Sequence, residues 1–163
     1  MYKIGDHLVY KRDVCKVVDI IEHGFKDLSY YVLMPINDKS LKIQIPTTIN
    51  KEYIRDLITK EKVEEIIKII PTIDIINVDT KLIENEYRRL LDSGEYIDLI
   101  KIIKTTYLRN QERVDSKKKI SDKDKKYFEK AEKYLYSEFS VVLNKTYDET
   151  KEYVINKVEE INK

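Results

Sequence analysis

The spacing of apolar residues changes its period once along the chain, near Thr59, and this change limits the possible folds more than any other feature of the sequence. Before it, short apolar or alternating runs are separated by turn residues, which is the pattern of β-strands. After it, apolar residues recur every three or four positions, as on one face of a helix. The sequence therefore predicts an α+β chain, β-rich over residues 1–58 and all-helical over residues 59–163.

Five runs in the first segment have the length and composition of strands. They are HLVY, VCKVVDII, SYYVLM, LKIQIP and YIRDLI, and Gly, Pro, Asn and Asp accumulate between them. Five short strands with tight connections predict a small, strongly bent five-stranded β-barrel.

The run LKIQIP is the candidate contact surface of this segment. Alternation directs Leu41, Ile43 and Ile45 toward the core, and Lys42 and Gln44 toward solvent. The run ends at Pro46, and a proline belongs at a sheet edge or a strand end. An exposed edge can pair with a strand of another protein, but Lys42 and Pro46 can equally serve to blunt the edge. The residues alone leave both interpretations open.

About five helices are expected in the second segment, over residues 60–70, 80–92, 96–113, 122–142 and 147–161. Thr59, Ser121 and Thr146 are their candidate N-caps, and Pro71 and Gly94 are stop signals. The expected core positions of the last three helices are Ile100, Ile103, Tyr107, Tyr127, Phe128, Ala131, Leu135, Phe139, Tyr147, Val154, Val158 and Ile161.

The sequence offers few residues that could support an enzymatic reaction. The sequence contains no phosphate-binding loop and no dinucleotide fingerprint, and its two histidines do not stand at helical spacing. Cys15, the single cysteine, lies in an apolar run and is expected to be a buried, inert thiol. We expect a non-enzymatic chain with no catalytic residues, metal, cofactor or small-molecule substrate. Without a signal peptide pattern or an apolar run of roughly 20 residues, it is expected in the cytoplasm, away from membranes.

The net charge of +1 hides a basic region, because residues 99–133 carry twice as many basic as acidic side chains. Clustered Lys and Arg attract duplex nucleic acid through counterion release. The same lysines, interspersed with acidic residues, also fit an ordinary solvated face. The basic residues at the junction of the third and fourth expected helices are Arg109, Arg113, Lys117, Lys118, Lys119, Lys123, Lys125, Lys126 and Lys130.

Several segments occur in the order found in one known family. These are YKIGDHLVY, YYVL followed by IQIP, IRDLI, LLDSGEYIDLIKIIKTTYLRNQER and FEKAEKYLYSEFS. Together they resemble the CarD/CdnL family of bacterial transcription regulators. The N-terminal domain of that family is a Tudor-like barrel related to the polymerase-binding module of the transcription-repair coupling factor.

The resemblance implies that the barrel pairs with the RNA polymerase β subunit through Lys42, Ile43, Gln44 and Ile45. It also implies that the helical segment contacts promoter DNA at the upstream edge of the transcription bubble, with little sequence preference, and modulates open-complex stability. The residues expected at DNA are Thr80, Lys81, Arg109, Arg113, Lys123, Lys125 and Lys126.

The sequence departs from the family in three places. It has no tryptophan, and the position of the family's DNA-wedging tryptophan falls at or near Thr80. The stretch KRDVCKV replaces a family turn, and a short insertion includes Lys117–Lys119. A polymerase- or protein-binding adaptor without wedge activity is therefore the alternative function, and both a monomer and a domain-swapped dimer are compatible with the sequence.

Overall fold

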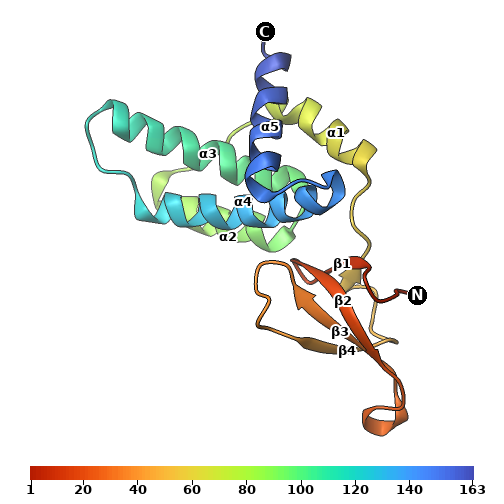
Figure 1. The fold of residues 1–163 in the computed structure, drawn as a ribbon. Coiled ribbons are helices and arrows are strands. Elements are labelled where there is room, and N and C mark those ends of the chain that lie inside the picture. Colours follow the sequence, from red (N-terminus) through yellow and green to blue (C-terminus); the bar gives the residue numbers. More distant parts are fainter. The chain divides into compact units, whose positions relative to one another are not determined.

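The change of apolar period at Thr59 coincides with a division of the chain in the computed structural model, which describes residues 1–163. Residues 1–58 form one unit and residues 59–163 the other. All strands lie in the first unit and all α-helices in the second (Figure 1). The predicted α+β fold class is confirmed.

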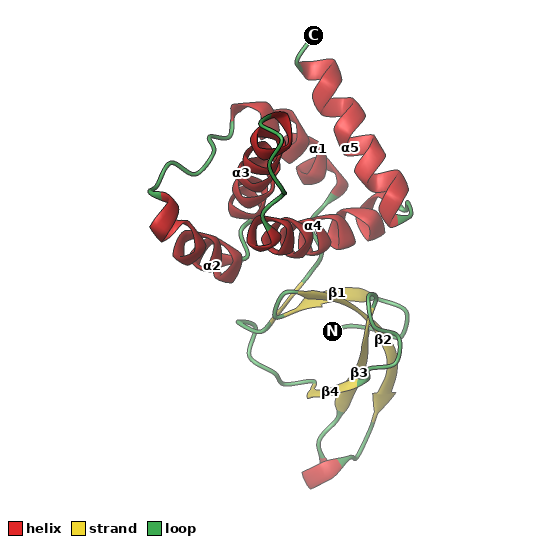
Figure 2. Cartoon of the chain, turned by 90° about the vertical axis from the view of Figure 1, so that its left-hand side faces the viewer, coloured by secondary structure: helices red, strands yellow, loops and turns green.

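The sheet of the first unit consists of five strands: β1 (His7–Tyr10), β2 (Asp13–Ile21), β3 (Tyr30–Pro35), β4 (Ile43–Pro46) and β5 (Ile54–Arg55). All pairs are antiparallel, and the spatial order is β4-β3-β2-β1-β5. A register shift between Val17 and Asp19 marks an irregularity of the bulge type, which bends a strand. The sheet curls into a half-barrel (Figure 2). By the strand order, its two edges are β4 and β5.

The core of the half-barrel is built from inward-facing residues of β1 to β4. Its fully buried members are Leu8, Cys15, Val17, Tyr31, Leu33 and Ile45. Burial raises the pKa of the Cys15 thiol to about 11, so the thiol stays protonated and unreactive at neutral pH.

Leu41 is an exception to the expected alternation, because it lies before β4 and is 46% exposed. The Asp38 carboxylate accepts hydrogen bonds from the backbone N–H and hydroxyl of Ser40, and the N–H of Leu41 donates to the Asp38 carbonyl at 3.2 Å. This turn keeps Leu41 out of the ladder, so the expectation that its side chain faces the core is wrong.

The second unit contains α1 (Lys60–Ile69), α2 (Ile83–Ser93), α3 (Tyr96–Asp115), α4 (Asp122–Leu143) and α5 (Tyr147–Ile161) (Figure 1). Two short 3-10 turns, η2 (Ile70–Thr72) and η3 (Thr80–Leu82), precede α2, and a third, η1 (Phe25–Asp27), lies in the first unit. The helix expected to begin at Thr80 therefore starts as η3 and becomes α-helical only at Ile83.

Side-chain caps define three of the helix starts. The hydroxyls of Thr59, Ser121 and Thr146 accept hydrogen bonds from the backbone N–H three residues later. At Thr146 the Glu149 carboxylate in turn accepts a hydrogen bond from the backbone N–H of the N-cap residue, which completes a capping box. The three predicted N-caps are confirmed.

The helical core differs from the expectation along one side of α3. Ile100 is buried, but Tyr107 is 57% exposed. At the far end of α5, Ile161 is 43% exposed. Helix α5 packs on α4 and α1, so it leaves the outer face of α3 near Tyr107 uncovered. The expectation that Tyr107 is a core residue is wrong for this reason, and the same expectation for Ile161 is wrong because α5 ends at this residue.

Replacing Leu33 by Ala is expected to destabilise the first unit by about 2–5 kcal/mol, because the change leaves a cavity at a position without exposed surface. Leu41→Ala removes the same atoms from an exposed side chain and is expected to cost well under about 1 kcal/mol. The rate at which a thiol reagent labels the buried Cys15 measures opening of this unit. Labelling should accelerate at least about thirtyfold in Leu33→Ala, and equal rates in the two variants would contradict this description of the core.

Candidate functional site

Strand β4 pairs only with β3, so its other side is a free sheet edge. The N–H of Thr47 donates to the carbonyl of Ser29 at 3.0 Å, and Ile45 and Ile43 stand two and four residues further along the same ladder. Hydrogen-bonded and non-hydrogen-bonded pairs alternate in antiparallel sheets, so Ile45 and Ile43 direct their backbone groups toward β3. The backbone N–H and C=O of Gln44 consequently face away from the sheet.

The four residues expected at the polymerase differ in exposure. Ile45 is 3% exposed and belongs to the core, and Ile43 packs partly against that core. Lys42, just before β4, and Gln44 are exposed. The edge therefore presents the side chains of Lys42 and Gln44 and the backbone of Gln44, while the two isoleucines hold the strand in place.

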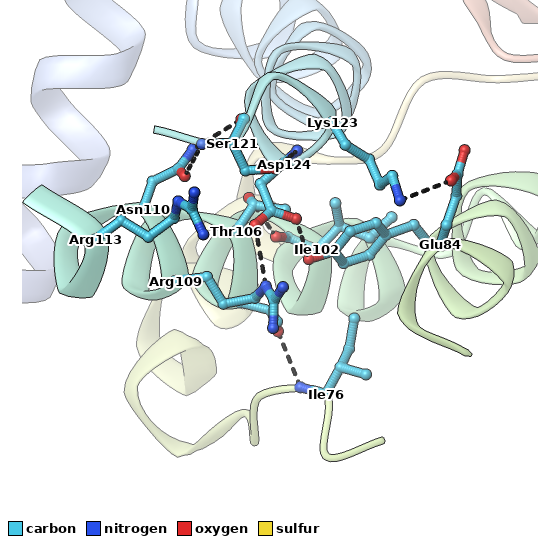
Figure 3. Close-up of polar contacts among 12 residues, drawn as sticks. Ile76, Glu84, Ile102, Thr106, Arg109, Asn110, Arg113, Ser121, Lys123 and Asp124 are labelled. Atoms are coloured by element: carbon cyan, nitrogen blue, oxygen red, sulfur yellow. Dashed lines mark hydrogen bonds and ion pairs between the residues drawn. The ribbon is translucent and has the colours of Figure 1, made fainter. Parts of the chain in front are cut away.

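In the second unit, the buried carboxylate of Asp124 joins three helices (Figure 3). Asp124 lies in the first turn of α4, and its side chain is 1% exposed. The Tyr87 hydroxyl of α2 donates to Oδ1 at 2.8 Å, and Arg109 Nε of α3 donates to Oδ2 at 3.0 Å. Burial, together with the bond to Asp124, raises the pKa of Tyr87, so the phenol remains a donor.

The connection between α3 and α4 is anchored at both of its ends. Ser121 N–H donates to Asn110 Oδ1 at 2.8 Å, and Asn110 Nδ2 donates back to the Ser121 carbonyl at 3.4 Å (Figure 3). Arg113 Nε donates to the Lys119 carbonyl at 2.6 Å. Residues 111–120 are all exposed, so these bonds hold a solvent-facing loop that displays Lys117–Lys119. We call residues 109–126 the basic junction.

Glu84, in the first turn of α2, collects several donors at the edge of the basic junction. Its carboxylate accepts from Arg88 Nη2 at 2.9 Å. It also lies 3.1 Å from Lys123 Nζ (Figure 3). The hydrogen bond from Lys123 holds the pKa of Glu84 below its usual range. The carboxylate thus stays ionised and compensates part of the positive charge of Lys123 and Arg88.

The residues expected at DNA lie on three elements. Of the α3 and α4 members, Arg109 and Lys123 are ion-paired with Asp124 and Glu84, and Lys125 lies 4.0 Å from the exposed Glu129. The structure brings these members together at the basic junction. The full set comprises Thr80 and Lys81 in η3, Arg109 and Arg113 on α3, and Lys123, Lys125 and Lys126 at the start of α4.

A comparison with family models identifies the helical unit. Residues 83–155 match the model of the CarD C-terminal domain, so the match begins with α2 and ends within α5. No curated protein matches the chain. The chain is of the CarD type. CarD-family proteins are regulatory rather than enzymatic, and this CarD-like chain is transcription-related.

The match to CarD covers the basic junction, but it begins after Thr80, the position at or near which the family's tryptophan was expected to fall. Thr80 and Lys81 precede residue 83, lie in η3 and are exposed. A threonine offers a small polar side chain where a wedge requires a large apolar one. The basic junction thus carries several cations, but η3 contains no aromatic residue.

Sequence reasoning missed two residues that organise the junction. Tyr87 looks like one of thirteen tyrosines at core-facing helical positions, and Glu84 looks like an ordinary exposed acid. Asp124 was expected only as part of the helix-start signal with Ser121. One feature of the sequence could have identified Asp124. It is an acidic residue at the third position of α4, and it lies on the same apolar face of that helix as Tyr127.

No group of three or more His, Cys, Asp or Glu side chains is arranged to hold a metal ion. None of the helices combines the length and apolar composition that crossing a bilayer requires.

Arg109→Met is expected to lower the free energy of unfolding of the helical unit by about 3 kcal/mol, because it leaves the buried Asp124 carboxylate without its cation. Arg89→Met is the matched control, since Arg89 pairs with Glu86 on the surface and should cost less than about 1 kcal/mol. Urea unfolding followed by far-UV circular dichroism measures both. Similar losses in the two variants would show that Asp124 does not depend on Arg109.

Proposed function

We propose that this CarD-type chain regulates transcription initiation by pairing the free edge of β4 with a strand of the RNA polymerase β subunit, while its helical unit contacts promoter DNA. The observation that carries the proposal is the outward-facing N–H and C=O of Gln44 on an unpaired edge. The proposed site of action is the upstream edge of the transcription bubble, in the bacterial cytoplasm.

The chemistry of β4 supports addition of a partner strand. A free edge supplies main-chain hydrogen bonds, and exposed side chains at alternate positions supply specificity. Pro46 has no N–H, and the N–H groups of Ile43 and Ile45 face β3, so within β4 the only outward donor is Gln44. A partner strand would therefore be fixed in register at this residue.

The basic junction supports contact with the DNA backbone. Lys117–Lys119 lie on the anchored loop, and Lys125 and Lys126 project from the first turns of α4. Arg109, Arg113 and Lys118, together with the acidic Glu112, also line a shallow hollow of about 250 Å³, which is large enough for a phosphate group. Such contacts depend on phosphate charge and carry no base sequence information.

The alternative is an adaptor that binds polymerase without wedging into DNA. The absence of tryptophan and the exposed Thr80 in η3 favour it. The paired state of Arg109 and Lys123 also reduces the positive charge available to phosphates. Duplex binding that weakens steeply with salt distinguishes the two functions, because an adaptor without DNA contact has none.

Gln44→Pro is expected to weaken binding to the purified polymerase β lobe at least about tenfold, because it removes the outward donor and leaves the β3–β4 hydrogen bonds intact. Gln44→Ala keeps the N–H and should bind within about twofold of the wild-type chain. A pull-down measures binding, and protection of Cys15 from thiol reagents verifies folding. Undiminished binding of Gln44→Pro would exclude β4 as the paired edge.

The double variant Lys125→Gln, Lys126→Gln should lower duplex affinity and flatten the slope of log K against log salt by about 2, because each lost phosphate contact contributes about 0.9. Lys60→Gln, Lys68→Gln removes the same charge from exposed positions on α1 and should leave the slope unchanged. Fluorescence anisotropy with a duplex at several salt concentrations measures both. A wild-type chain without salt-dependent binding would overturn the DNA contact and leave the adaptor function.

A further inference from the structure

A pocket of about 410 Å³ opens in the helical unit between α3, α4 and α5. Its apolar lining includes Ile103 and Tyr107 of α3, Phe128 of α4 and Val158 of α5. A second hollow of about 370 Å³ shares Tyr107 and Phe128 with it and extends it toward Val114. Protein pockets that bind small molecules typically have this size and this predominantly apolar lining.

One buried carboxylate, that of Glu132 on α4, belongs to the pocket wall. Glu132 is 6% exposed, and its two carboxylate oxygens lie 3.2 and 3.0 Å from Lys151 Nζ of α5. Burial raises the pKa of Glu132 in spite of Lys151, and the nearby Glu129 acts in the same direction. The single partner therefore compensates the carboxylate charge only in part.

We propose that this pocket binds a small molecule that carries a primary ammonium group on an aromatic or branched aliphatic body. The ammonium group donates to the Glu132 carboxylate, and the body fills the space between Ile103, Tyr107 and Phe128. The main pocket contains none of the residues proposed to contact polymerase or DNA, and only its extension reaches residues of the basic junction, Val114 and Lys125 among them.

The charges around the pocket favour a cationic ligand over an anionic one. Lys104 Nζ donates to the carbonyls of Ile70 and Ile73 at 2.9 and 2.6 Å, so its charge is already engaged. The side chain of Lys151 is 38% exposed and can turn into solvent, whereas that of Glu132 is only 8% exposed. An anionic ligand would add a negative charge beside the buried Glu132 carboxylate, which is costly.

The aromatic wall of the pocket provides a second reason to expect a cationic ligand. The ammonium group of Lys151 lies over the ring of Phe128, 5.7 Å from its centroid. A ring face that accepts one ammonium group accepts another in the same place. A ligand ammonium that displaces Lys151 therefore retains both the carboxylate and the aromatic contact.

Three probes with one body and different head groups test the proposal: phenylpropylamine, phenylpropanol and phenylpropionate. In NMR titrations of the full chain, the amine should bind in about the millimolar range and at least about tenfold more tightly than either of the others. Shift changes should centre on the residues around Phe128. If phenylpropylamine and phenylpropionate bound the wild-type chain equally well, the proposal would be overturned, and no variant would be needed to show this.

Glu132→Gln should abolish the preference for the amine, whereas Glu152→Gln, which changes an exposed carboxylate of α5 outside both hollows, should preserve it. Lys151→Met removes the competing ammonium group and should tighten amine binding. A Glu132→Gln chain that keeps the preference would overturn the proposal. Neither polymerase nor DNA takes part in these titrations, so their failure is distinguishable from failure of the proposed function.

Discussion

The arrangement of the helical unit depends on the partners of one buried carboxylate, that of Asp124. An ionised carboxylate removed from water is costly unless hydrogen bonds and an opposite charge compensate it. The Tyr87 hydroxyl of α2 and Arg109 Nε of α3 donate to this carboxylate, and the backbone N–H of Asp124 donates to the hydroxyl of the N-cap Ser121. The three helices therefore satisfy Asp124 only in one relative arrangement, and the anchored loop between α3 and α4 follows from it.

This constraint divides the basic residues into two groups. Arg109 is 33% exposed in its side chain and compensates Asp124, and Lys123 shares Glu84 with Arg88. Lys117–Lys119 on the loop and Lys126 on α4 have no such acidic partner in the contacts described above. A count of basic residues overestimates the charge available to DNA, because part of that charge stabilises the junction that presents the remainder.

Local signals could be predicted from the sequence, and contacts between distant residues could not. The N-caps at Thr59, Ser121 and Thr146 depend on a few neighbouring residues, so the pattern identifies them. The bond between Tyr87 and Asp124 joins residues 37 positions apart, and no periodicity encodes it. The exposure of Tyr107 likewise depends on where α5 packs, which the amphipathic pattern of α3 does not specify.

The two units offer different physical modes of recognition. The β4 edge acts through directional main-chain hydrogen bonds, which ionic strength affects little, whereas the basic junction acts through phosphate charge, which salt screens. In the proposed function, specificity for the transcription machinery therefore comes from the edge, and the junction adds affinity for whichever duplex lies nearby. With Thr80 in place of an apolar wedge, the proposed contact would engage the DNA backbone and would not enter a base step. The chain would then act on initiation by holding upstream DNA close to the polymerase, and its effect on open-complex stability would vary with salt.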